Sequence, residues 1–166
     1  GEPTRDGLET KDYTVSNGEV CHPRTIAAPP SLMVLNDNSI VIDHRATPNV
    51  RQAFSGVIPL VENGQVVASL YDMSKPDNTE GHARNIEGEN AAGHQMVLES
   101  EGVYPNQGLK HYQAAEIMQQ YGAVTAAFMS GGGDVSCRFN GQSLIIPENI
   151  NPATGAHFER PLPNVF

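Results

Sequence analysis

The residues best suited to chemistry form a glycine-rich block in the last third of the chain, Met129-Ser-Gly-Gly-Gly-Asp134, directly after an apolar run. Three consecutive glycines carry no side chains, so a ligand can approach the backbone closely and the amide groups can converge on an anion. Ser130 adds a hydroxyl and Asp134 a carboxylate. The block lacks the Gly-Lys-Ser/Thr ending of a P-loop, and a triple glycine alone is more often a flexible turn than a site.

A second group of reactive side chains lies in the polar segment Gly81-His-Ala-Arg-Asn-Ile-Glu-Gly88. Arg84 offers a planar fork suited to a phosphate, and His82 and Glu87 are candidate proton donors or acceptors. A third group is Glu159-Arg160 near the C-terminus. Solvated loops often carry such charges, so each group alone is also consistent with a surface that has no function.

The sequence supports neither a metal site nor a Ser-His-Asp catalytic site. The six histidines include no pair with HExxH spacing, and there is no CxxC, so we expect no metal and no other cofactor. No serine lies in a Gly-x-Ser-x-Gly elbow. Cys21 and Cys137 are the only cysteines, and one disulfide or two buried free thiols are both open interpretations.

The composition narrows the class of protein. A chain of 166 residues suits a single domain, with an extended N-terminal part over residues 1–50 and a core over 50–166. The net charge of −9 argues against nucleic acid and anionic membranes as partners, because neutralising phosphates requires clustered Lys and Arg. No apolar run approaches the roughly 18 residues of a membrane span. The start at Gly1, without Met or a signal segment, suggests an excised domain or a processed product.

Three hairpins are expected to build the framework around these residues. Each has two apolar segments joined by a short turn of Asn, Asp or Gly residues, and two of the turns contain Asn-Gly, the strongest short hairpin signal. The hairpins cover residues 31–43, 57–70 and 135–146. They predict an α+β fold with a largely antiparallel or mixed sheet.

One main helix is expected to pack on this sheet. Apolar residues recur at helical spacing over residues 108–121, and Gly122 follows where a left-handed C-terminal cap is required. The apolar run 123–129 is too short for another helix and predicts a buried strand that leads into the glycine block. The polar segment 73–90 predicts a long ordered loop, a kind of segment that is often functional.

The order of these blocks over residues 50–166 resembles the phosphodiester glycosidase family. That family shows a Gly-Pro-x-Leu-Val hairpin, an Arg-Thr-Ala-Ile-Gly motif, an Asp-Gly-Arg segment, a helix that begins Gly-Leu, an Asp-Gly-Gly-Gly-Ser-Ser block, a Val-Asn-Gly turn and a final Glu-Arg-Pro. The corresponding segments are Phe54–Gly64, Arg84–Gly88, Glu101–Gly102, Gly108–Val124, Gly131–Gly133, Phe139–Gly141 and Glu159–Asn164. Arg24-Thr25 also fits the Arg-Thr motif, but spacing to the helix favours Arg84.

The resemblance implies hydrolysis of a sugar-1-phosphodiester, of the N-acetylglucosamine-1-phosphodiester or surface-polymer type, outside the cytoplasm. A carboxylate is needed to assist departure or activate water, and donors must hold the phosphate. The catalytic candidates are Asp134, Glu101, Glu159 and His82, with Glu87 as a further carboxylate; the phosphate-binding candidates are Arg84, Gly131, Gly132, Gly133, Ser130 and Arg160.

The sequence departs from the family pattern at the proposed site. Ser130 stands where the family has Asp before the glycines, and Asp134-Val135 stands where it has Ser-Ser. Asn85 replaces the Thr, and Val103 replaces the Arg of Asp-Gly-Arg. An alternative function is therefore a non-catalytic carbohydrate-binding or structural domain of a larger cell-surface or phage-virion protein. A carbohydrate or sugar-phosphate ligand is expected in either case, and a homo-oligomer remains open.

Overall fold

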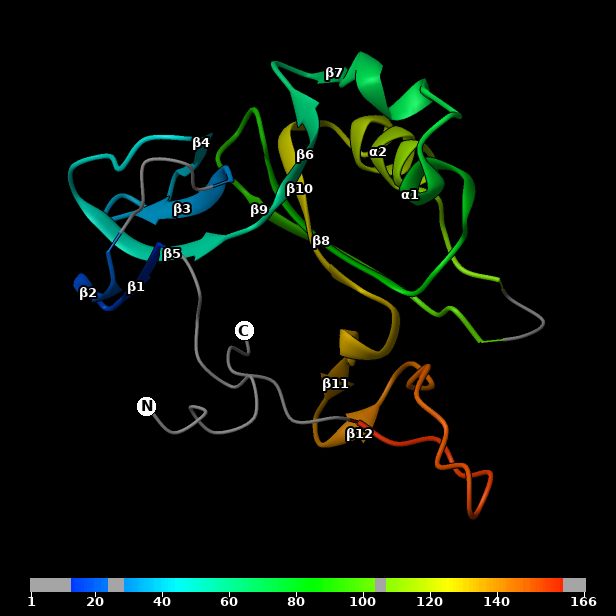
Figure 1. Cartoon of the computed structure of the whole chain (residues 1–166). Coiled ribbons are helices and arrows are strands. Elements are labelled where there is room, and N and C mark those ends of the chain that lie inside the picture. The colour runs from blue at the N-terminus through cyan, green and yellow to red at the C-terminus, as the bar shows by residue number, and fades with distance from the viewer. Residues whose placement is uncertain (1–12, 24–28, 104–106, 160–166) are drawn as a thin grey trace. The chain divides into compact units, whose positions relative to one another are not determined.

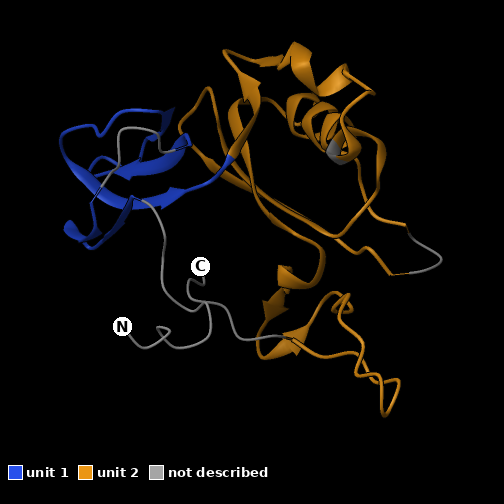
Figure 2. Ribbon diagram, in the orientation of Figure 1, with its two compact units in different colours: residues 1–57, 160–166 blue, residues 58–159 orange. Residues whose placement is uncertain are grey.

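The structure of the chain is a computed structural model that describes residues 13–23, 29–103 and 107–159. The chain has two compact units, residues 1–57 with 160–166 and residues 58–159 (Figure 2). Each unit is built around one five-stranded sheet (Figure 1). The expected single domain over residues 1–166, with its two parts meeting near residue 50, stays a prediction.

The sheet of the first unit is antiparallel in every described pairing and has the strand order β2-β1-β5-β3-β4. The predicted hairpin 31–43 is confirmed, because β3 pairs with β4. Three further strands, β1, β2 and β5, were not predicted. A small core cluster of Tyr13, Val15, Met33 and Ala53 lies in this unit. The strands are β1 (Thr14–Ser16), β2 (Glu19–His22), β3 (Ser31–Leu35), β4 (Ile40–Asp43) and β5 (Val50–Ser55).

The sheet of the second unit has the order β7-β6-β10-β8-β9, again with antiparallel pairs throughout the described part, and a two-stranded β11-β12 ribbon accompanies it. The described residues of this unit form two helices, together with 3₁₀ turns at Ala68–Tyr71 and Gly132–Asp134. The elements are β6 (Ile58–Glu62), β7 (Gln65–Val66), α1 (Pro76–Thr79), β8 (Arg84–Asn90), β9 (Gln95–Ser100), α2 (His111–Gln120), β10 (Ala123–Gly131), β11 (Arg138–Phe139) and β12 (Gln142–Ser143).

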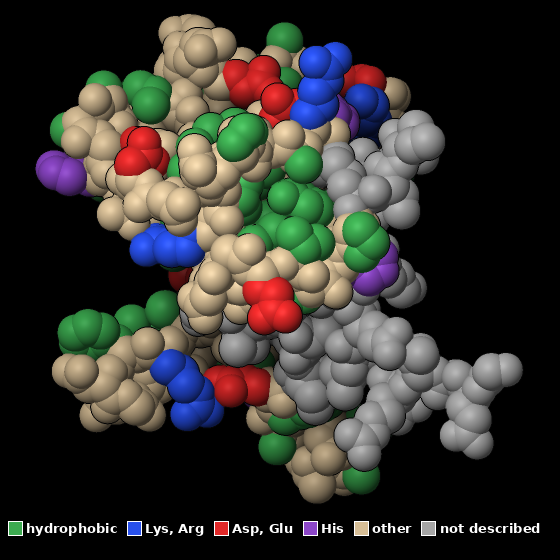
Figure 3. Space-filling view, turned by 90° about the vertical axis from the view of Figure 1, so that its left-hand side faces the viewer, with side chains coloured by type: hydrophobic (Ala, Val, Ile, Leu, Met, Phe, Trp, Pro, Cys, Tyr) green, Lys and Arg blue, Asp and Glu red, His purple; other side chains and the backbone are tan. Residues whose placement is uncertain are grey.

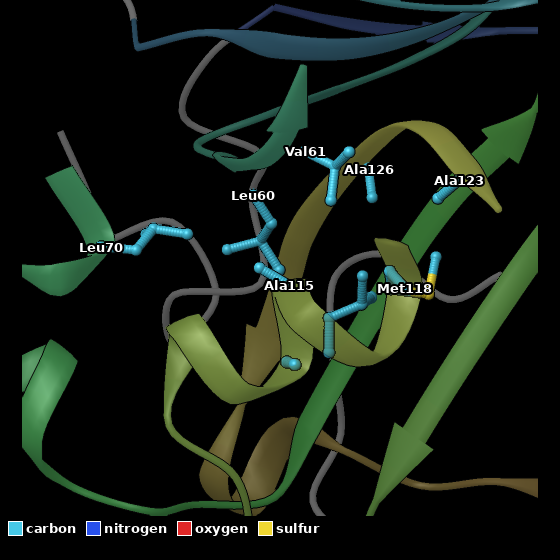
Figure 4. Packing of buried hydrophobic residues seen from close by; sticks show 9 residues of the cluster. Leu60, Val61, Leu70, Ala115, Met118, Ala123 and Ala126 are labelled. Atoms are coloured by element: carbon cyan, nitrogen blue, oxygen red, sulfur yellow. The ribbon is translucent and has the colours of Figure 1, made fainter. Parts of the chain in front are cut away.

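The predicted main helix is α2, and it covers one face of the second sheet. Its apolar stripe packs onto β6, β8 and β10, where a core cluster includes Leu60, Ile86, Met118 and Ala126 (Figure 4). The helix ends as expected: Gly122 has a φ of +91° and its N–H donates to the Gln119 carbonyl at 2.9 Å. Antiparallel sheets with one main helix confirm the α+β class.

The predicted long loop over residues 73–90 is wrong for its second half, which is β8, a strand inside the sheet. Its residues directed at α2 include Ile86 and Gly88, so only one large apolar side chain marks the buried face. A Cβ at Gly88 would collide with the Thr125 carbonyl oxygen of β10 and lie 2.9 Å from the Ala126 Cβ. Glycine here permits close packing of backbone, but in the sequence it is read as a loop signal.

The two other predicted hairpins are present, but their paired segments are shorter than predicted. In the hairpin 57–70, β7 spans two residues before a 3₁₀ turn begins at Ala68, and in the hairpin 135–146 the paired segments β11 and β12 have two residues each. The two cysteines are free thiols in this structure; Cys137 is half-buried and Cys21 is exposed, so the expectation of two buried thiols is wrong for Cys21.

Among the residues that Figure 3 does not draw in grey, Lys, Arg, Asp and Glu side chains are scattered over a mostly uncharged face, in keeping with the charged fraction of 17%. None of the helices in the described part of the chain has both the length and the apolar content needed to cross a bilayer. Glu159 is the last described residue, so the candidate Arg160 lies outside the described residues.

Candidate active site

The glycine block lies at the end of β10, beside the start of β8. Gly131 is the register partner of Arg84, and Ser130 is the partner of Asn85. A Cβ at Gly131 would lie 2.9 Å from Nη1 of Arg84 and 3.1 Å from the Ala83 carbonyl oxygen. The next residue, Gly132, donates its N–H to the same Ala83 oxygen at 2.9 Å. The two groups predicted from the sequence, the block and the segment 82–84, are therefore in direct contact.

Arg84 is buried, with 5% of its surface exposed. Its Nε donates to the Leu109 carbonyl at 2.9 Å and its Nη2 to the Glu80 carbonyl at 3.2 Å. The guanidinium carbon lies 5.1 Å from the centre of the Phe128 ring, a cation–π distance. Arg84 thus joins the start of β8 to the segments before it and before α2, and it places a fixed positive charge under the glycine block.

The backbone around His82 is held by glycines from two other segments. His82 and Leu109 exchange backbone hydrogen bonds of 2.9 and 3.3 Å. A Cβ at Gly108 would collide with the His82 carbonyl group, and a Cβ at Gly102 would collide with the Ala83 amide nitrogen. These two glycines belong to the segments that the resemblance singled out, and their common role is to let backbone approach His82.

His82 lies between two carboxylates. Its Nδ1 is 3.4 Å from Oε1 of Glu148, and its Nε2 is 3.3 Å from Oε2 of Glu80. The side chain of Glu148 is 26% exposed, that of His82 41% and that of Glu80 67%. Glu148 was not predicted as a site residue. It is 66 positions from His82, and no motif or spacing in the sequence connects the two.

The segment that contains Glu148 also supports the far side of the glycine block. Nδ2 of Asn149 donates to the Gly133 carbonyl at 2.7 Å. Gly132 has a φ of +60°, a left-handed conformation that favours glycine, and a Cβ there would lie 3.3 Å from Oε2 of Glu148. Glu148 and Asn149 therefore line the candidate site, and the sequence did not reveal either of them.

The three carboxylates predicted from the sequence as catalytic candidates have different surroundings in the structure. Asp134 is half-buried and closes the 3₁₀ turn of the glycine block. Glu101, next to Gly102, accepts the N–H of Ile146 at 2.9 Å. Glu159 forms a bidentate ion pair with Arg138, at 3.0 and 3.2 Å. Glu101 and Glu159 thus have structural partners, and the catalytic roles of all three stay predictions.

A further carboxylate pair lies on the face of β8 and β9 opposite α2. Burial raises the pKa of Glu87, and burial together with the charge of Glu87 raises the pKa of Glu99 to about 7. Glu99 is the register partner of Asn85, which in turn pairs with Ser130. Oε2 of Glu99 and Oδ1 of Asn85 are buried with no hydrogen-bond partner. Ser130, Asn85 and Glu99 thus form a polar row that begins at the glycine block and crosses β8 to β9 on the face opposite α2.

The fold defined by these elements matches solved structures that differ strongly in sequence. The structure of the zebrafish N-acetylglucosamine-1-phosphodiester alpha-N-acetylglucosaminidase catalytic domain, auto-inhibited by its pro-peptide, superposes with a TM-score of 0.78 at 17% identity, over 93% of this chain and 56% of that one. A hypothetical protein from Synechocystis matches with a TM-score of 0.51 at 20% identity, over 89% of this chain and 32% of that one. This chain therefore spans about half the length of the zebrafish structure and a third of the other.

The family is defined by sequence as well as by fold. The model of the phosphodiester glycosidase family matches residues 2–166, and the chain belongs to that family. A search of curated proteins finds no match. The resemblance inferred from the ordered motifs over residues 50–166 is confirmed, and it extends to nearly the whole chain.

Proposed function

We propose that this chain carries the site of a glycosidase that hydrolyses a sugar-1-phosphodiester at the anomeric C–O bond. Membership of the phosphodiester glycosidase family supports the reaction class. The observation that links the proposal to particular residues is the contact between the glycine block and the start of β8. There Gly132 donates to the Ala83 carbonyl, and Gly131 leaves room for the guanidinium of Arg84.

The reaction needs few strong catalytic groups, because a phosphate monoester is a fair leaving group. The bond between the anomeric carbon and the phosphate oxygen breaks, the oxygen of water bonds to that carbon, and one proton of the water leaves. The products are a free sugar and a phosphate monoester. Asp134, Glu101 or Glu159 is proposed to accept the proton of water, and His82 is proposed to exchange a proton with the departing phosphate.

Phosphate capture is proposed to be local rather than long-range. With a net charge of −9, the field of the whole chain does not attract anions. The buried guanidinium of Arg84 lies against Gly131, so its positive charge acts where water is scarce and electrostatic interactions are strong. The segment Gly131–Gly133 and Ser130 complete the proposed phosphate site. Arg160, which lies outside the described residues, stays a candidate from the sequence alone.

The sugar is proposed to be a neutral hexosamine or a similar unit of a surface polymer, and the protein to act outside the cytoplasm, at a cell surface or on a phage virion. A chain with a charged fraction of only 17% and many Asn and Gln residues supplies neutral polar groups for the hydroxyl and acetamido groups of such a sugar. The zebrafish structure of the same fold is named for an N-acetylglucosamine-1-phosphodiester substrate, and this agrees with the proposal.

The test is release of free sugar from a panel of sugar-1-phosphodiesters, including teichoic-acid-like polymers, by the purified chain. Turnover that is lost in Asp134→Asn and retained in Asp37→Asn, an exposed carboxylate of the first unit, supports the proposal. Binding of glycans without release of sugar from any member of the panel would instead identify a carbohydrate-binding module and overturn it. The departures at Ser130 and Asp134 make this second outcome a specific alternative.

A further inference from the structure

The imidazole of His82 has unequal partners on its two nitrogens. Glu148 faces Nδ1 from a largely buried position, with 26% of its side chain exposed, whereas Glu80 faces Nε2 with 67% exposed. An exposed ion pair contributes little because water and salt screen it. A pair in a drier environment is screened much less. The two contacts of 3.4 and 3.3 Å are therefore not equivalent, and the one with Glu148 is the stronger constraint on the ring.

The second oxygen of Glu148 reinforces this asymmetry. Oε2 is buried and has no hydrogen-bond partner. It lies beside Gly132, and the Glu148 carboxyl carbon would be 3.1 Å from a Cβ at Gly102. A carboxylate enclosed by backbone in this way loses hydration, and it requires a nearby donor or positive charge to be tolerated. The imidazole of His82 is the side-chain donor that the structure places against it.

The position of His82 is fixed by backbone rather than by its side chain. Its two backbone hydrogen bonds with Leu109, and the close approach of Gly102 and Gly108, hold the residue where Nδ1 meets Glu148. Only the rotation of the ring and its tautomer are left to the side-chain contacts. Within the described residues, no group of three or more His, Cys, Asp or Glu side chains is arranged to hold a metal ion.

We propose that Glu148 is a positioning residue that accepts a hydrogen bond from Nδ1–H of His82 and so fixes the ring with Nε2 on the opposite side, toward the exposed Glu80. The chemical role of the pair rests on the proposed function. In that reaction, His82 in its protonated form donates the Nε2 proton to the phosphate oxygen as the C–O bond breaks. Glu148 stays ionised and stabilises the imidazolium, and the proton is restored to His82 from solvent.

The distances are compatible with this role. Hydrogen bonds of catalytic groups are often long in the absence of substrate and shorten when it binds. Oε2 of Glu148 also lies 3.3 Å from the position of a Cβ at Gly132, so the imidazole–carboxylate pair directly adjoins the block that would contact the phosphate.

The first test measures the tautomer directly and needs no substrate. In protein labelled with ¹⁵N-histidine, long-range ¹H–¹⁵N correlations at neutral pH are expected to show His82 with a protonated, hydrogen-bonded Nδ1. Glu148→Gln is expected to shift the Nδ1 signal of His82, whereas Glu80→Gln, the same chemical change at the other nitrogen, leaves Nδ1 nearly unchanged. Identical Nδ1 signals in wild type and Glu148→Gln, or a larger change in Glu80→Gln, would overturn the proposal.

The second test uses kinetics on a substrate that the chain hydrolyses. His82→Ala is expected to lower kcat by about 10²- to 10⁴-fold, the usual contribution of one general acid, and added imidazole is expected to restore part of it. Glu148→Gln is expected to lower kcat at least about tenfold with little change in KM, because it misorients the acid without touching the substrate. Glu148→Asp, which keeps the carboxylate, is expected to recover part of the loss.

The outcomes separate this inference from the proposed function. If wild type hydrolyses a substrate while folded His82→Ala is equally active, the inference and the proposed role of His82 fail, and the proposed hydrolysis of a sugar-1-phosphodiester stands. If wild type hydrolyses nothing on the panel, the proposed function fails, and the spectra still decide whether Glu148 holds His82. If circular dichroism shows that Glu148→Gln does not fold, two other measurements decide: the activity recovered in Glu148→Asp and the activity that imidazole restores to His82→Ala. If neither variant recovers activity, the proposed pairing of Glu148 with His82 is refuted.

Discussion

Replacing Glu99 by Gln should stabilise the protein at alkaline pH and not at acidic pH. Burial, with a smaller contribution from the charge of Glu87, raises the pKa of Glu99 to about 7 from its ordinary value of 4.5. The folded protein therefore holds a proton that the unfolded chain releases as the pH rises from about 4.5 to about 7. As the pH rises through that window, ionisation of Glu99 lowers the free energy of unfolding progressively, and the loss reaches its full size above about pH 7.

The size of the effect follows from the shift and from the exposure of the side chain. For a fully buried group, the change from 4.5 to about 7 would correspond to about 3 kcal/mol. Glu99 is only half-buried, and solvent screening reduces the expected effect to roughly 1–2 kcal/mol. Gln imitates the neutral carboxyl, so Glu99→Gln should exceed wild type by this amount at pH 8, and the two should converge as the pH approaches 4.5.

The assay is urea denaturation of both proteins at pH 4.5, 6 and 8, followed by circular dichroism. Glu62→Gln, which removes a charge from an exposed position on β6, controls for the change in net charge. A stability difference between Glu99→Gln and wild type that is constant with pH, or that grows toward acidic pH, would refute the argument that Glu99 is desolvated beside Glu87.

Two further changes test how the candidate site is held. Gly108→Ala should impair folding and any activity far more than Gly122→Ala: both glycines have positive φ, at +66° and +91°, but only at Gly108 would the new Cβ collide with backbone, that of His82. Equal melting temperatures for the two variants would contradict the close approach of these segments. Asn149→Ala should lower the free energy of unfolding by about 1 kcal/mol, since it removes the hydrogen bond to the Gly133 carbonyl. A urea midpoint equal to that of wild type would show that this bond does not hold the glycine block.

The sequence predicted the parts of the fold in which local signals agree with the tertiary structure. The helix over 108–121 and its glycine cap, and the apolar strand that begins at residue 123, all have a regular pattern and a chemical end signal. The strand β8 was not predicted, because its buried face combines an arginine, one isoleucine and a glycine. Close packing against β10 requires that glycine, and the reason appears only when both strands are present.

The candidate site could likewise be predicted only in part. Gly131–Gly133, Arg84 and His82 were identified because their residue types are unusual in short segments, and the structure brings them together. Glu148 was not, since an isolated Glu in a polar segment carries no signal of its partner 66 residues away. The structural partners of Glu101 and Glu159 were equally hidden, because ion pairs and backbone contacts depend on the fold rather than on the motif.

The central claim, that this site cleaves the bond between the sugar and the phosphate, is tested most directly by hydrolysis in H₂¹⁸O. Attack of water at the anomeric carbon predicts ¹⁸O in the released sugar and none in the phosphate monoester, as read by mass spectrometry. Label in the phosphate product would mean cleavage of the P–O bond and a phosphodiesterase instead. Failure to release any product from the panel of sugar-1-phosphodiesters would contradict the account as a whole.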